Sequence, residues 1–157
     1  MPQRNSWEEE VRTRIRAHRV KASGAMWDAK LDLIKPPFRI ECKETDTDCY
    51  RVNMRVWKTV FDYAVHASNS PMMAIRVRNM EFAVLDANDW QAMGLTVSGS
   101  YGKKQVIALK EDIMTSLNQG PMWTELYKIG HPNKAIVIVP FKTFERVIEH
   151  AIEKKLQ

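Results

Sequence analysis

Two short runs of alternating apolar and polar residues, joined by Pro36-Pro37, place the strongest constraint on the fold of this 157-residue chain. The runs are KLDLI at residues 30–34 and FRIECK at residues 38–43. Alternation with a period of two is typical of strands that bury one face, and consecutive prolines favour a turn. The sequence therefore predicts two adjacent strands with a tight connection between them.

The alternation assigns each side chain to one face of this hairpin. The apolar set, which we expect to face the core, is Leu31, Leu33, Phe38, Ile40 and Cys42. The opposite set is Asp32, Arg39, Glu41 and Lys43. If the two strands pair across the turn, Asp32 comes near Glu41. A carboxylate beside a lysine on an exposed strand face is also a common form of surface charge pairing, and that alternative stays open.

Two neighbouring carboxylates suit a hard cation such as Mg²⁺, which takes oxygen ligands and keeps several waters. A lysine at the same place can activate a metal-bound water and stabilise charge that develops on a phosphate. Asp32, Glu41 and Lys43 are therefore candidate catalytic residues.

The rest of the chain alternates between helical and strand patterns, without repeats or a linker. Helices are predicted at residues 6–19, 50–67, 87–93, 111–120 and 144–155, strands at 72–77, 81–86, 105–110 and 135–140, and a turn-rich connection at 98–104. This order predicts an α/β fold with a mixed central sheet flanked by helices, in a single domain over residues 1–157.

The first predicted helix combines a capping signal with a dense basic run. Ser6 is the expected N-cap, and Glu9 follows three residues later as in a capping box. The apolar stripe of this helix is expected to contain Trp7, Val11, Ile15 and His18. Acidic side chains in the first turn of a helix are stabilised by the positive end of the helix dipole. This effect is by itself a sufficient explanation for the glutamates at 8–10. The basic run is Arg12, Arg14, Arg16, Arg19 and Lys21.

Composition narrows the classes of partner and of cellular setting. The net charge of +5 favours a polyanionic partner. No apolar run reaches the length of a membrane span, and the first residues lack the apolar segment of a secretion signal. Cys42 and Cys49 match no metal-ligand spacing and indicate no disulfide framework, so we expect a reducing cytoplasm. The small size and the lack of a targeting signal fit a prokaryotic or phage-infected cell.

Asp32, followed nine residues later by Glu41-Cys42-Lys43, resembles the motif of the PD-(D/E)XK nuclease superfamily. Leu31 stands where that motif has proline. The three glutamates at 8–10 resemble an acidic element on the first helix of relatives, and Ser23-Gly24 resembles an element of archaeal and phage Holliday junction resolvases. The resemblance covers residues 6–80 and implies a restriction-endonuclease-like core.

The resemblance also implies roles for particular residues. Asp32 and Glu41 would bind Mg²⁺ or Mn²⁺, with the carbonyl of Cys42 as a further ligand and Glu8 completing the site, or Glu10 in its place. Lys43 would act on the attacking water, and Ser23 would contact the phosphate or order the site. The basic charge of the chain, rather than the resemblance, gives the expected DNA-binding residues: Arg12, Arg14, Arg16, Arg19, Lys21, Lys30, Lys103 and Lys104. A solvated face for the 12–21 run and a plain connection at 98–104 are the alternatives.

The function expected from these features is metal-dependent, structure-selective cleavage of DNA, with a Holliday junction resolvase as the first candidate. Paired incisions would require a homodimer, with residues 50–67 or 141–155 at its interface. The alternatives are another repair or recombination nuclease of the same superfamily, or a non-catalytic DNA-binding module. Metal dependence of cleavage separates the last alternative from the first two.

Overall fold

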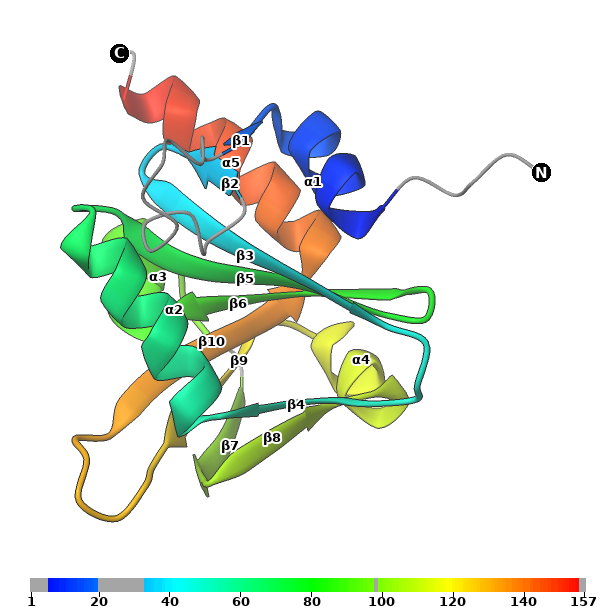
Figure 1. Cartoon of the computed structure of the whole chain (residues 1–157), viewed down its shortest axis with the longest axis vertical. Coiled ribbons are helices and arrows are strands. Elements are labelled where there is room, and N and C mark those ends of the chain that lie inside the picture. Colours follow the sequence, from blue (N-terminus) through cyan, green and yellow to red (C-terminus); the bar gives the residue numbers. More distant parts are fainter. Residues whose placement is uncertain (1–5, 20–32, 98, 156–157) are drawn as a thin grey trace, which may run out of the picture.

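An eight-stranded mixed sheet forms the centre of the computed structural model, which describes residues 6–19, 33–97 and 99–155 (Figure 1). Its strand order is β1-β2-β3-β5-β6-β10-β9-β7. The bounds are β1 His18–Arg19, β2 Leu33–Lys35, β3 Phe38–Thr45, β5 Ser70–Val77, β6 Met80–Asp86, β7 Gly99–Lys104, β9 Met122–Leu126 and β10 Lys134–Pro140. A separate antiparallel pair is formed by β4 (Tyr50–Asn53) and β8 (Val106–Leu109).

Helices cover both faces of this sheet. Along β5, alternate residues enter two different apolar clusters: Met72 and Ala74 join one, and Met73 and Ile75 join the other. The first cluster contains residues of α1 (Trp7–Ile15), α3 (Ala87–Ala92) and α5 (Phe141–Lys155), and the second contains residues of α2 (Met54–His66) and α4 (Glu111–Leu117). We call these the α1 face and the α2 face. The predicted α/β architecture with a helix-flanked mixed sheet is confirmed.

The hairpin predicted around Pro36-Pro37 is present. Strands β2 and β3 pair antiparallel, with Leu33 opposite Ile40 and Lys35 opposite Phe38. Leu33, Phe38 and Ile40 are buried in the cluster of the α1 face, as the alternation predicted. Residues 30–32 of the predicted first strand lie outside the described residues. On its other side β3 pairs parallel with β5 over its full length.

Helix α1 starts where the sequence predicted and ends earlier. The Ser6 side chain accepts a hydrogen bond from the Glu9 backbone N–H at 3.2 Å, which confirms the N-cap. The helix stops after Ile15 because Arg16 adopts a left-handed conformation with φ 56°. The prediction that His18 continues the apolar stripe is wrong: His18 is exposed and lies in β1.

The predicted helix over residues 50–67 begins with a strand instead. Tyr50–Asn53 pairs with β8, and α2 begins after Asn53, whose side chain accepts a hydrogen bond from the Val56 backbone N–H at 2.9 Å. The buried residues of α2 are Met54, Trp57, Val60 and Ala64. The true helix is therefore shorter, and its first turn lies near the start of β8 and the loop after β9.

Residues 98–104 were predicted to be a turn-rich connection, and this is wrong for residues 99–104. They form β7, which pairs parallel with β9, a strand that the sequence patterns did not indicate. The predicted strands at 72–77, 81–86, 105–110 and 135–140 and the helices near 87–93, 111–120 and 144–155 are present. None of the described helices combines the length and the apolar character of a membrane span.

Candidate active site

Glu41 and Lys43 lie side by side on the α2 face of β3. Their neighbours along the strand, Ile40 and Cys42, pack into the cluster of the opposite face, so the period of two turns Glu41 and Lys43 toward α2. Lys43 Nζ is 3.4 Å from Glu41 Oε1, and the Glu41 side chain is only 12% exposed. The predicted shared face of these two residues is therefore present, as is the predicted packing of Cys42.

A pocket opens above this pair. Its volume is about 420 Å³, and it is lined by Glu41, Lys43, Tyr50, Arg55, Val56, Thr59, Val60 and Met73. Strands β3 and β5 form its floor, and the first turns of α2 form a wall. The pocket therefore combines a carboxylate, an ammonium group and a guanidinium group within one hollow.

The phenol of Tyr50 adds a neutral polar group to this hollow. Burial raises the pKa of Tyr50 above its usual value; Lys43 lowers the pKa and Glu41 raises it, and the net change is upward. Tyr50 therefore stays protonated at neutral pH and can donate a hydrogen bond into the pocket.

Several residues assigned to the site from the sequence lie outside the described residues: Ser23, Asp32, Lys21 and Lys30. Within the described part of the chain, no group of three His, Cys, Asp or Glu side chains is arranged to hold a metal ion. Glu41 is the predicted metal ligand that the structure places in the pocket. A two-carboxylate site there requires Asp32, which is bonded directly to Leu33.

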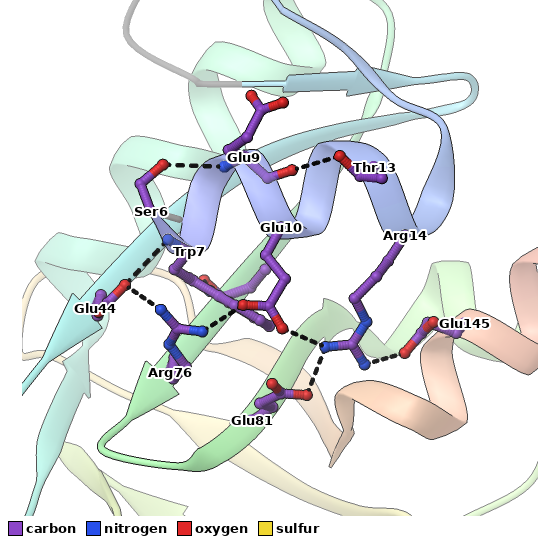
Figure 2. Close-up of polar contacts among 11 residues, drawn as sticks. Ser6, Trp7, Glu9, Glu10, Thr13, Arg14, Glu44, Arg76, Glu81 and Glu145 are labelled. Carbon is purple, nitrogen blue, oxygen red and sulfur yellow. Dashed lines mark hydrogen bonds and ion pairs between the residues drawn. The ribbon is translucent and has the colours of Figure 1, made fainter. Parts of the chain in front are cut away.

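The three glutamates of α1 lie on a helix that covers the opposite face of the sheet. Glu10 pairs with Arg76 Nη1 at 2.5 Å, and Glu44 pairs with Arg76 Nη2 at 2.9 Å (Figure 2). Glu44 also accepts a hydrogen bond from the Trp7 backbone N–H at 3.1 Å. This network fastens the start of α1 to β3 and β5, and Glu10 is part of it.

Glu9 serves the helix itself and the strand that follows. Its carboxylate pairs with Arg12 and Arg19, and the hydrogen bond from Arg12 is the main reason that its pKa is lowered from 4.5 to about 2. Glu8 is half-buried in the same first turn. Its assignment to the metal site stays a prediction.

The predicted DNA-binding arginines of the first helix are largely engaged with carboxylates. Arg14 pairs with Glu145, with Glu81 at 2.7 Å and with Glu10 at 3.5 Å (Figure 2). Arg12 and Arg19 pair with Glu9, whereas Arg16 is exposed at the end of the helix. Phosphate binding by the paired arginines would have to compete with these contacts.

Sequence reasoning missed several residues, among them Arg55 in the pocket and Arg76 in the ion-pair network of α1. Arg55 lines the pocket with Glu41 and Lys43, but its sequence context is an ordinary polar position of an amphipathic helix. Arg76 lies in a strand and is 1% exposed, although nothing in the run MMAIRV indicates a buried charge. Both roles depend on residues distant in the chain, so no local signal marks them.

Comparison with known protein families finds no family that matches the chain, and comparison with curated proteins finds no similar sequence. The geometry of the described residues is therefore the basis for the functional proposal.

Proposed function

We propose that this protein is a metal-dependent, structure-selective DNA endonuclease with a restriction-endonuclease-like core, and that it resolves four-way junctions. The observation that carries the proposal is the Glu41–Lys43 pair on β3, which is open to a pocket on the α2 face. A carboxylate and an ammonium group in one partly buried hollow are suited to phosphodiester hydrolysis.

In this proposal Asp32 and Glu41 would hold a divalent cation, with the Cys42 carbonyl as a further ligand. Asp32 directly precedes Leu33 in the sequence, and Leu33 is paired with Ile40, the neighbour of Glu41. The bound cation would supply a water of lowered pKa and polarise the phosphate.

The residues of the pocket have separate tasks. Lys43 orients the attacking water and stabilises negative charge on the phosphate, and Glu41 holds the ammonium group of Lys43 in place at 3.4 Å. Arg55 and the Tyr50 phenol face the same hollow and would bind the non-reacting phosphate oxygens. Resolution requires two paired incisions, so the active form would be a homodimer.

A non-catalytic DNA-binding module is the second candidate. The direct Glu41–Lys43 ion pair favours it, because such a pair satisfies both charges without any metal. Cleavage in the presence of a divalent cation decides between the two functions.

The test compares four-way junctions, flaps and linear duplexes with Mg²⁺ or Mn²⁺. We expect symmetric paired nicks in the junction, and a loss of about 100-fold or more in cleavage rate for Glu41→Gln and for Lys43→Met, with binding kept. Asp48→Asn, which removes an exposed carboxylate after β3, is the matched control and should cleave at the normal rate. Unpaired nicks would indicate another nuclease of this kind, and binding without any cleavage would overturn the nuclease proposal.

A further inference from the structure

Three neighbouring hollows meet at Arg55, near the start of α2. The first contains Glu41 and Lys43, the second contains Gln105, Val106 and Ile129, and the third contains Lys58 and His131. Arg55 lines all three, and Lys128 lines the second and the third. We call this continuous depression the α2 groove. It leads from the candidate active site to the loop at residues 127–133, between β9 and β10, which lies beside the first turn of α2 in Figure 1.

Two cations of the α2 groove are available for a ligand. Lys43 is paired with Glu41, and Lys58 is paired with Asp62 at 2.6 Å. Arg55 and Lys128 are exposed, and neither side chain has an ion-pair partner among the described residues. Exposed cations without counter-charges on one groove attract a polyanion.

The far end of the groove adds a second basic element. The Tyr127 backbone N–H donates to the Lys104 carbonyl at 3.1 Å, which holds the end of β7 against the start of the 127–133 loop. Lys103 and Lys104 are exposed on β7. These two lysines were predicted from the sequence to bind DNA, and the structure places them beside the loop that carries Lys128.

An apolar side chain stands among these cations. Ile129 is 89% exposed, and Val106, which lines the same hollow, is 42% exposed. Gly130 has φ +86°, a conformation that side-chain-bearing residues rarely adopt, and it closes the turn directly after Ile129. The loop therefore presents Ile129 at its tip, next to Lys128.

We propose that the α2 groove is the path of a DNA strand from the Glu41–Lys43 site to the 127–133 loop, where Ile129 inserts between bases at a branch point. This path rests on the proposed nuclease function, and it specifies the substrate of that site as DNA with a branch point. Arg55 and Lys128 bind phosphates along the path. Ile129 packs against base faces that are exposed where stacking is interrupted. An apolar side chain that inserts at such a step is removed from water, and this favours the insertion.

The dimensions suit a short strand segment. Three strands, β5, β6 and β10, separate β3 from β9, so four spacings of about 4.8 Å put these two strands about 19 Å apart across the sheet. At about 3.4 Å of helix axis per phosphate of one strand, about 19 Å of axis corresponds to about six nucleotides of one strand in a duplex.

A second copy of this chain is the other occupant that an exposed Ile129 suggests. In a two-fold symmetric contact the same patch meets itself, so Arg55 and Lys128 would face Arg55 and Lys128 of the other copy. Like charges without carboxylate partners disfavour that contact, whereas phosphates neutralise them.

The cation test measures binding to a labelled four-way junction in EDTA, where cleavage does not occur, over a series of salt concentrations. We expect Arg55→Gln and Lys128→Gln each to reduce the slope of log affinity against log salt by about 0.9, the value for one phosphate contact. Lys142→Gln, an exposed cation on α5 and thus on the α1 face, is the matched control and should keep the slope. An unchanged slope in both groove variants would overturn the proposed path.

The wedge test compares the junction with a linear duplex of the same length. Ile129→Ala should reduce the preference for the junction by about tenfold, which is the factor that burial of an isoleucine side chain supplies. Val65→Ala changes an aliphatic residue that is 51% exposed and lies outside the groove, and it should leave the preference unchanged. If Ile129→Ala retains the preference for the junction over the duplex, the proposed insertion of Ile129 is wrong. Dissociation of a dimer by Ile129→Ala, measured by sedimentation, with the preference kept, would assign the surface to a second copy and also overturn it.

These outcomes are distinct from those of the cleavage assay. If the groove variants bind normally while Glu41→Gln abolishes cleavage, the path is wrong and the nuclease stands. If the wild-type protein binds junctions through Arg55, Lys128 and Ile129 but cleaves nothing, the nuclease is wrong and the binding surface stands.

Discussion

Glu9 illustrates how one half-buried side chain connects a helix to the strand that follows it. Its backbone N–H completes the cap on Ser6, while its carboxylate joins Arg12 of the same helix to Arg19 of β1. The hydrogen bond from Arg12 is the main reason that the pKa of Glu9 falls to about 2. Because the folded protein holds this carboxylate ionised, its ionisation is linked to folding.

The direction of this linkage gives a pH-dependent prediction. A folded pKa of about 2, below the ordinary 4.5, means that the contribution of Glu9 to stability is fully present above pH 4.5 and is lost as the pH falls toward 2. Carboxyl NMR titration should place the Glu9 midpoint near 2 in the wild-type protein and closer to 4.5 in Arg12→Gln. A wild-type midpoint near 4.5 would contradict the Arg12–Glu9–Arg19 arrangement.

At this scale the sequence predicted only what local periodicity determines. Glu41 and Lys43 share a face because residues two apart in a strand always do, and Leu33 and Phe38 are buried for the same reason. The burial of Arg76 depends on Glu10 from α1 and Glu44 from β3, which are distant in the chain. Pairing of that kind leaves no mark in the residues next to Arg76.

At the scale of elements, the boundary between β4 and α2 decides where Arg55 lies. The run 50–67 has helical periodicity throughout, but Tyr50–Asn53 gains backbone partners from β8, and the Asn53 side chain caps the helix that follows. A strand partner some 50 residues away overrides local propensity here, and single-sequence reasoning has no access to it. The same cause explains why β7 and β9 were not predicted, since they pair mainly with each other and with β10.

The Asn53 cap can be tested by substitution. Asn53→Ala removes the acceptor for the Val56 backbone N–H and should lower the free energy of unfolding by about 1 kcal/mol, whereas Asn53→Asp keeps an acceptor and should cost much less. Urea denaturation of both variants measures the difference. Equal losses in the two variants would show that another property of Asn53, not the cap, stabilises the start of α2.

At the scale of the whole molecule, the two faces of the sheet differ in how their cations are paired. On the α1 face, arginines are paired with glutamates from several elements, as in the contacts of Arg14 with Glu81 and Glu145. On the α2 face, Arg55 and Lys128 border a groove and have no ion-pair partner within the described residues. The dense basic run of the sequence and the cations available to a ligand are therefore different sets, and only the tertiary structure distinguishes them.

This division predicts opposite effects for two arginine substitutions. Arg14→Met removes a guanidinium that is 23% exposed and leaves Glu81 and Glu145 without their partner, so it should lower the free energy of unfolding by about 1–3 kcal/mol. Its affinity for DNA under folding conditions should stay near that of the wild-type protein. Arg55→Gln should do the reverse, because its side chain is exposed and makes no ion pair with any of the described residues.

Urea denaturation and junction binding at one salt concentration, measured on the same preparations, separate the two effects. If Arg14→Met weakens DNA binding as much as Arg55→Gln does, the DNA also contacts the α1 face, as the basic run of residues 12–21 first indicated. The carboxylates on Arg14 would then act as competitors that phosphate displaces, and the affinity of Glu145→Gln for DNA should rise, because one of those competitors is removed. Normal binding by Arg14→Met together with weak binding by Arg55→Gln would assign the α1 face to stability and the α2 face to the ligand.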